Sequence, residues 1–260
     1  MMGTYLHFGR KNLHTNLARF SILLLACSAR AFASDTIFTG DNQVFSQVVD
    51  GGSWKTTITL LNLGNNTATF ALNFFGDDGK VLAFDTNLGS NNAFAGTIPP
   101  HGSVILSTNG TKQTLSQGWG LLTPGSDSVV SGSALFRARS TGQPDLEAAV
   151  PGDSSFDSRL TFPFDHQTTG TGIALVDQFS FTPITISILI RDENGSQLVL
   201  DSFTMQAMTH LAITLNVRYP QTLGHRGSVE VSTTGLGVNV LGLRYSGATF
   251  TSLVPVSSFP

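Results

Sequence analysis

Apolar and polar residues alternate at every second position in short runs along most of the chain. Phe70, Leu72 and Phe74 alternate with small or polar neighbours, and the segment 186–190 places Ile at every second position in the same way. Successive side chains of a β-strand point to opposite faces, so residues i, i+2 and i+4 share one side. We therefore expect each trio to face the core of a sheet. No run of roughly 11 or more residues after the first 33 shows the period of about 3.6 that predicts a helix.

Turn-forming residues separate these alternating runs. Asp77-Asp78-Gly79 and Glu193-Asn194-Gly195 are hairpin signals, because Asp, Asn and Gly tolerate the positive φ that tight hairpin turns require. Pro99-Pro100-His101-Gly102 precedes a further apolar run, and Pro151-Gly152-Asp153-Ser154-Ser155 forms a breaker-rich joint near the middle. Many short strands without intervening helices predict antiparallel sheets.

The second half of the chain repeats the apolar skeleton of the first. The segment 50–61 lies over 165–176, with Ile58 over Ile173 at a shift of 115 positions. After a slip of one residue the two trios and the two hairpin signals also align. A unit of about 100 residues is the size of one β-sandwich. We therefore predict an all-β protein of two tandem antiparallel, immunoglobulin-like β-sandwiches from an internal duplication, at residues 34–152 and 153–260.

The first 33 residues have the form of a secretory signal peptide. Arg10, Lys11 and Arg19 precede the apolar stretch 20–26, and Ala31-Phe32-Ala33 fits the site that signal peptidase cleaves. This predicts a secreted or periplasmic protein with no transmembrane segment after cleavage. The alternative is lipidation of Cys27, which follows Leu24-Leu25-Ala26 as in a lipobox, and would anchor the protein at the cell envelope.

Charge and cysteine content narrow the possible partners. Four of the 14 Lys and Arg and none of the 17 Asp and Glu lie in residues 1–33, so the rest carries 10 basic and 17 acidic side chains, a net charge of −7. An acidic chain without a basic run argues against nucleic-acid partners and anionic membrane surfaces. Cys27 is the only cysteine, so neither disulfides nor a thiol nucleophile are expected after cleavage.

Residue types that carry catalysis or bind metals show no convincing pattern. Gly152-Asp153-Ser154 resembles a lipase and esterase nucleophile block, but it lies in the joint and no Asp-x-x-His follows. The histidines are scattered, so we interpret them as surface or turn residues. Asp77-Asp78 is interpreted as a turn. We therefore expect no catalytic residue, no metal and no cofactor. The scattered histidines are His101, His166, His210 and His225.

Two tryptophans are the best binding candidates. Trp54 lies over Thr169 in the second half, so the shared skeleton does not require an aromatic residue there. The glycines at 51 and 52 favour a loop that presents its indole, with Lys55 beside it as a donor, as in a carbohydrate-binding face. The alternative is that Trp54 covers one open end of the first sandwich. Trp119, between two glycines, is expected in the core or at an edge.

Arg137 and Arg244 end matching segments, LFR and GLR, just before the last strand of each half. We interpret them as equivalent structural arginines that bond loop carbonyls or a carboxylate such as Glu147.

Several longer phrases resemble an uncharacterised family of secreted tandem β-sandwich proteins from environmental bacteria. The resemblance covers most of residues 44–256, and the chain departs from the family where Ser53 replaces a third glycine. It implies secretion and a non-enzymatic β architecture, and it assigns no catalytic residue. The phrases are FSQVVDGGSWKTTITLLNLG, FFGDDGKVL, IPPHGSVIL, SGSALFRAR, TGIALVD, IRDENGSQL, RGSVEVS and LGLRYSGATFTSLVPV.

These observations predict a non-enzymatic, exported structural, adhesive or ligand-binding module of the cell envelope or exterior, with an unidentified glycan or protein as its partner. Two alternatives stay open. One is a carbohydrate-binding module that uses Trp54 and neighbouring loops, which requires an accessible aromatic surface. The other is a hydrolase with its site between the sandwiches, which requires carboxylates or histidines that converge in one cleft.

Overall fold

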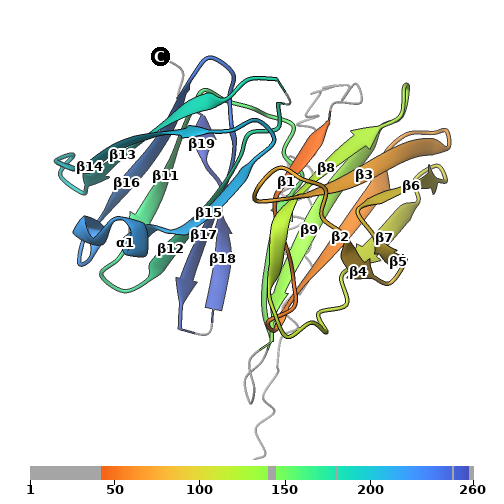
Figure 1. Ribbon diagram of the computed structural model, residues 1–260, viewed down its shortest axis with the longest axis horizontal. Helices are drawn as coiled ribbons and strands as arrows, with labels where there is room; N and C mark the ends of the chain where they lie inside the picture. Colours follow the sequence, from red (N-terminus) through yellow and green to blue (C-terminus); the bar gives the residue numbers. More distant parts are fainter. Residues whose placement is uncertain (1–41, 140–144, 180, 248, 258–260) are drawn as a thin grey trace, which may run out of the picture. The chain divides into compact units, whose positions relative to one another are not determined.

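The computed structural model describes residues 42–139, 145–179, 181–247 and 249–257 (Figure 1). Strands make up nearly all of the regular structure in these residues, which confirms the all-β prediction. The helical elements found there are one turn, α1 (Leu215–Arg218), and the 3₁₀ turn η1 (Pro220–Thr222). Neither is long or apolar enough to cross a bilayer, and the described residues contain no other helix.

Residues 43–151 form two four-stranded antiparallel sheets and a small hairpin, which we call the first sandwich. The β1 sheet has the order β1-β8-β3-β6, the β2 sheet has the order β10-β9-β2-β7, and β4 pairs with β5. The strands are β1 (Gln43–Asp50), β2 (Trp54–Asn62), β3 (Ala68–Gly76), β4 (Phe84–Thr86), β5 (Gly89–Asn91), β6 (Ala93–Ile98), β7 (Ser103–Ser107), β8 (Ser116–Pro124), β9 (Val130–Ala138) and β10 (Leu146–Pro151).

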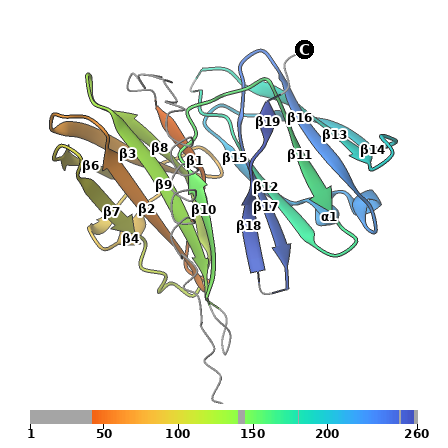
Figure 2. The same ribbon diagram turned by 180° about the vertical axis from the view of Figure 1, so that it is seen from behind.

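Residues 159–257 form two further antiparallel sheets, the second sandwich. The β11 sheet has the order β14-β13-β16-β11-β19 and the β12 sheet has the order β15-β12-β17-β18 (Figure 2). The strands are β11 (Arg159–Asp165), β12 (Gly170–Val176), β13 (Ile184–Asp192), β14 (Gln197–Met205), β15 (His210–Thr214), β16 (Arg226–Thr234), β17 (Asn239–Ser246), β18 (Thr249–Leu253) and β19 (Val256–Ser257).

The two sandwiches share one strand order. When β12 is matched with β2, the order β18-β17-β12-β15 repeats β10-β9-β2-β7, and β11-β16-β13-β14 repeats β1-β8-β3-β6. The second sandwich adds β19 at the edge of β11, while the first adds the β4-β5 hairpin. The same pairings therefore position the side chains in both halves.

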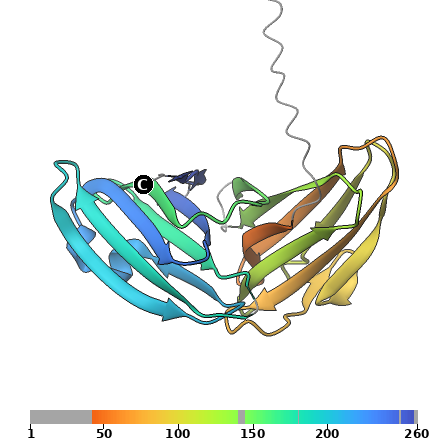
Figure 3. The ribbon, with the colours of Figure 1, turned by 90° about the horizontal axis from the view of Figure 1, so that it is seen from above.

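Each sandwich encloses an apolar core between its two sheets, which are visible as layers in Figure 3. Phe70, Leu72 and Phe74 of β3 are buried in the first core, where the ring of Phe74 lies 5.2 Å from that of Phe84. Ile at 186, 188 and 190 of β13 is fully buried in the second core. Both trios therefore face a core, as their alternation predicts.

A sharp reversal joins β1 to β2. Gly51, Gly52 and Ser53 have φ of 82°, 57° and 78°, all in the left-handed region. A Cβ on Gly51 would lie 2.3 Å from the Thr114 carbonyl oxygen, so this position requires glycine. The glycine run therefore forms a tight turn that leads directly into β2 at Trp54, and not an open loop.

Candidate functional site

The outer face of the β12 sheet packs against the first sandwich. Cross-strand register places three groups of residues on this side, and we call them the junction face. Ala174 and Leu241 belong to the apolar cluster of the first sandwich, and Val176 packs in a cluster with Trp119. Most of its residues are buried or half-buried. The junction face consists of Gly170, Gly172, Ala174 and Val176 from β12, His210, Ala212 and Thr214 from β15, and Asn239, Leu241, Leu243 and Tyr245 from β17.

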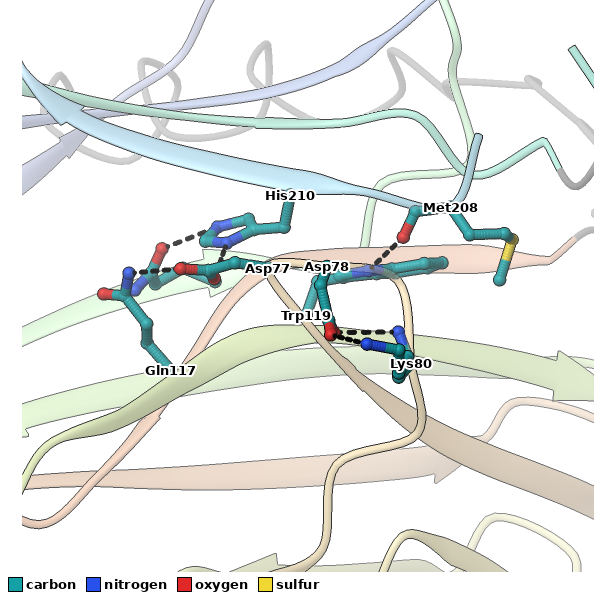
Figure 4. Close-up of polar contacts among 8 residues, drawn as sticks. Asp77, Asp78, Lys80, Gln117, Trp119, Met208 and His210 are labelled. Carbon is teal, nitrogen blue, oxygen red and sulfur yellow. Dashed lines mark hydrogen bonds and ion pairs between the residues drawn. The ribbon is translucent and has the colours of Figure 1, made fainter. Parts of the chain in front are cut away.

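Trp119 anchors the apolar part of this contact. It lies on β8 but on the outer side of the β1 sheet, and it is nevertheless fully buried, in a cluster with Val44 and Val176. Its ring stacks on Phe75 with centroids 4.7 Å apart, and its indole N–H donates to the Met208 carbonyl at 3.0 Å (Figure 4). Trp119 therefore joins the two sandwiches, whereas the sequence predicted a place in the core or at an edge.

A polar network lies beside Trp119. The side chain of His210 has no exposed area, and its Nδ1 lies 2.7 Å from Asp77 Oδ1 while its Nε2 lies 2.9 Å from Gln47 Oε1. Gln117 donates its Nε2 hydrogen to the other oxygen of Asp77 at 2.8 Å (Figure 4). Because a carboxylate oxygen accepts, Nδ1 of His210 is the donor in that bond. His210 of the second sandwich is thus bonded by two residues of the first, Asp77 and Gln47, and Gln117 bonds the same carboxylate of Asp77.

The carboxylate of Asp77 is stabilised in its charged form. Partial burial by itself raises the pKa of Asp77, but hydrogen bonds from His210 and Gln117 outweigh burial and hold this pKa below its usual value. A carboxyl group with a depressed pKa in the folded state adds stability above its unfolded pKa, and that contribution is lost as the pH falls through the folded pKa.

We expect Asp77→Asn to reduce the dependence of stability on pH in the acid range. The free energy of unfolding, measured by urea denaturation, should fall by about 0.5–1 kcal/mol at pH 7, a small value because Asp77 is half-exposed and solvent screens it. The difference between wild type and variant should shrink below the unfolded pKa of aspartate, about 3.9. The exposed turn residue Asp127, replaced by Asn, is the control. An unchanged pH profile in Asp77→Asn would contradict the assignment.

A groove adjoins this network. It has a volume of about 320 Å³ and is lined by residues of both sandwiches. Trp54, Phe136 and Tyr245 contribute aromatic rings to its wall, while Gln47 and Gln117 come from the polar network. Among the described residues, no Asp, Glu, Lys, Arg or His lines it. The groove is therefore a neutral, aromatic site with amide groups at one side.

Trp54 is half-buried on the core side of β2, in phase with Ile58 and Leu60, and packs against the edge of the first core. Its ring centroid lies 5.6 Å from that of Phe250 in β18. Lys55 follows it in the strand and faces the opposite side of the sheet. The expectation that a loop presents Trp54 and Lys55 together is therefore wrong. This position fits the alternative, in which Trp54 covers one open end of the first sandwich. Trp54 also forms part of the lining of the groove.

The two repeat arginines do not form part of this site. Arg137 bonds Glu147 at 2.6 Å, as its type predicts, and also lies near Asp145. Arg244 donates to Thr169 Oγ1 at 3.4 Å.

The strand register also corrects the equivalence of these arginines. Ile58 pairs with Ala134 and Ile173 pairs with Gly242. If Ile58 and Ile173 are equivalent, Ala134 is equivalent to Gly242 and Arg137 is equivalent to Tyr245. Arg244 is then equivalent to Phe136, one residue before Arg137. The segments LFR and GLR are therefore similar in letters but shifted by one position in the sheet.

Sequence reasoning missed the role of two histidines. His210 lies in the network above, and His166 is buried with its Nδ1 2.8 Å from Thr222 Oγ1; burial lowers the pKa of His166. The spacing of the histidines in the sequence does not predict either of these buried positions. The available signal was the small-residue row Gly170, Gly172 and Ala174, on a strand face where an exposed sheet usually carries polar side chains.

Comparisons of the chain with protein-family models, with curated proteins and with solved structures found no match. Within the described ranges, no group of three or more His, Cys, Asp or Glu is placed to hold a metal ion. Cys27 and the signal-like residues 1–33 lie outside the described residues.

Proposed function

We propose that this protein is a non-enzymatic, exported binding module of the cell envelope or exterior, and that its ligand lies in the groove between the sandwiches. The observation that carries the proposal is the groove itself, with three aromatic rings, three neutral polar side chains and no charged lining residue. Concave, mostly apolar sites with a few placed polar groups are the usual form of ligand pockets. The signal-like leader supports export, either free or with a lipid on Cys27.

A neutral glycan is the ligand class that we favour. Sugar C–H faces pack on aromatic rings, and Trp54 and Tyr245 offer two rings at one site. Gly172 forms part of the floor and leaves room for close approach of a ligand. Gln47, Gln117 and Thr214 supply uncharged donors and acceptors for hydroxyl groups. A charged ligand would find no opposite charge in this lining.

The hydrolase alternative has less support in this groove. A general acid or base must reach the reacting group of its substrate. The groove lining contains no carboxylate or histidine, and the neighbouring His210 has both ring nitrogens engaged and no exposed side-chain area. These observations favour a binding role for the groove.

We further propose that the two sandwiches are immunoglobulin-like and arose by internal duplication, in keeping with the resemblance to secreted tandem β-sandwich proteins. The shared strand order supports duplication. Counting β1, β2, β3, β6, β7, β8 and β9 as strands A to G, the pairs β2–β7 and β3–β8 correspond to the immunoglobulin pairs B–E and C–F. The first, fourth and seventh strands take different neighbours, β8, β3 and β2, from those of the immunoglobulin constant-type fold.

Filling the floor of the groove tests the proposed function. We expect Gly172→Leu to fold, because a Cβ there meets only ordinary contacts of 3.7 Å and 4.0 Å, and to lower ligand retention at least about tenfold by occupying the groove. Retention of the exported protein on a glycan panel and on envelope fractions is the measurement. Ser131→Leu, on the outer face of β9, is the matched control. Equal retention by wild type and Gly172→Leu would place the ligand elsewhere.

A further inference from the structure

A second cavity lies where β1, β10 and β17 meet the segment 252–257. Its volume is about 230 Å³, and it shares no lining residue with the groove. Most of its wall is apolar, including Val44, Val150 and Leu241. Of the described residues in its lining, the charged ones are two acids, Asp153 and Asp157, and none is a Lys, Arg or His.

A buried amide outside the cavity lining bonds two of the lining residues. Asn239 is fully buried, and its Nδ2 donates to Asp153 Oδ2 at 3.2 Å and to the Ser155 carbonyl, both from residues that line the cavity. Its Oδ1 has no hydrogen-bond partner among the described residues. Asn239 therefore holds the Asp153 carboxylate from a position that is not itself part of the lining.

We propose that this cavity binds a small organic amine, with an apolar body in the cavity and a primary ammonium group against the lining acids Asp157 and Asp153. An ammonium group has three donors and no acceptor, which suits two carboxylates. The backbone N–H and the hydroxyl of Ser155 both donate to Asp153 Oδ1 and fix that carboxylate in place. The net charge of −7 over residues 34–260 also favours a cation over an anion.

The size of the cavity limits the ligand. An apolar protein cavity of about 150 Å³ accepts benzene. The present volume of about 230 Å³ therefore has room for one ring and a short aminoalkyl arm. 2-Phenylethylamine is a probe of this size, and 2-phenylethanol is its neutral counterpart of nearly equal shape.

The experiment is calorimetric titration of the exported protein with each probe at pH 7. We expect saturable binding of 2-phenylethylamine and at least about tenfold weaker binding of 2-phenylethanol, because hydrogen bonds to charged groups contribute more than neutral ones. Asp157→Asn should weaken amine binding by a similar factor. Glu193→Gln, a surface acid paired with Arg226, should leave it unchanged.

Two further variants locate the site. Val254 lines the cavity and is largely exposed, so Val254→Trp should block the opening with little effect on folding, and should abolish amine binding. Gly172→Leu, which fills the groove, should leave amine binding intact. Absence of saturable amine binding by the wild type, equal affinity for amine and alcohol, or normal amine binding by Asp157→Asn would each overturn the proposal, even if Val254→Trp failed to fold.

Discussion

Replacing Trp119 with alanine should lower the free energy of unfolding by about 3–5 kcal/mol and separate the unfolding of the two sandwiches. The ring is fully buried between them, and its removal leaves a void against Phe75, Val44 and Val176. It also leaves the Met208 carbonyl without the indole donor. Differential scanning calorimetry should show one transition in the wild type and two in the variant, because the sandwiches no longer stabilise each other.

Trp119→Phe is the matched control. It keeps an aromatic ring on Phe75 but lacks the indole N–H, so the loss should be smaller, about 1–3 kcal/mol, with a single transition. If Trp119→Ala unfolded in one transition at the wild-type temperature, Trp119 would not join the sandwiches.

The second large effect is expected from the two cores. Phe74→Ala should cost about 3–5 kcal/mol and Ile188→Ala about 2–5 kcal/mol, because both side chains are fully buried and their removal leaves cavities. Each change should lower the stability of its own sandwich most, as seen by calorimetry or by hydrogen exchange of its strands. The control is Leu61→Ala, on the outer face of β2, where the side chain is 42% exposed and a loss below about 1 kcal/mol is expected. Two nearly silent core variants would disprove the assignment of these faces.

Local patterns were sufficient for the sheets. The alternation at 70–74 and 186–190 identified core faces because side-chain direction in a strand depends only on the parity of the position. The hairpin at Glu193-Asn194-Gly195 was predictable because Gly195 adopts a φ of 84° that other residues avoid. Both features depend on a few neighbouring residues.

The junction was not predictable from such patterns. Asp77 and His210 are separated by 133 positions, and nothing near either residue indicates the other. The sequence predicts a turn at Asp77, which the structure confirms, and a surface or turn position for His210, which is instead buried. Trp54 was recognised as unusual, but the orientation of its ring depends on β18, which lies far along the chain. The site is therefore formed by contacts between residues that lie far apart in the sequence, which local patterns do not predict.

The contact between the two sandwiches is asymmetric, and this has a consequence for the assembly of several copies of the protein. The first sandwich uses the outer side of its β1 sheet to meet the β12 sheet of the second, so the contact is head-to-tail, and a contact of that type can propagate into open-ended fibres between copies. The counterpart of the junction face in the first sandwich is the outer side of its β2 sheet. There Thr57 and Thr59 stand where the junction face has Gly172 and Ala174, and Arg137 stands where it has Tyr245. Thr59 is bulkier than Ala174, which packs into the apolar cluster of the first sandwich, and Arg137 is charged. We therefore expect this face to bind a second molecule poorly, so that the contact forms within one chain and does not propagate.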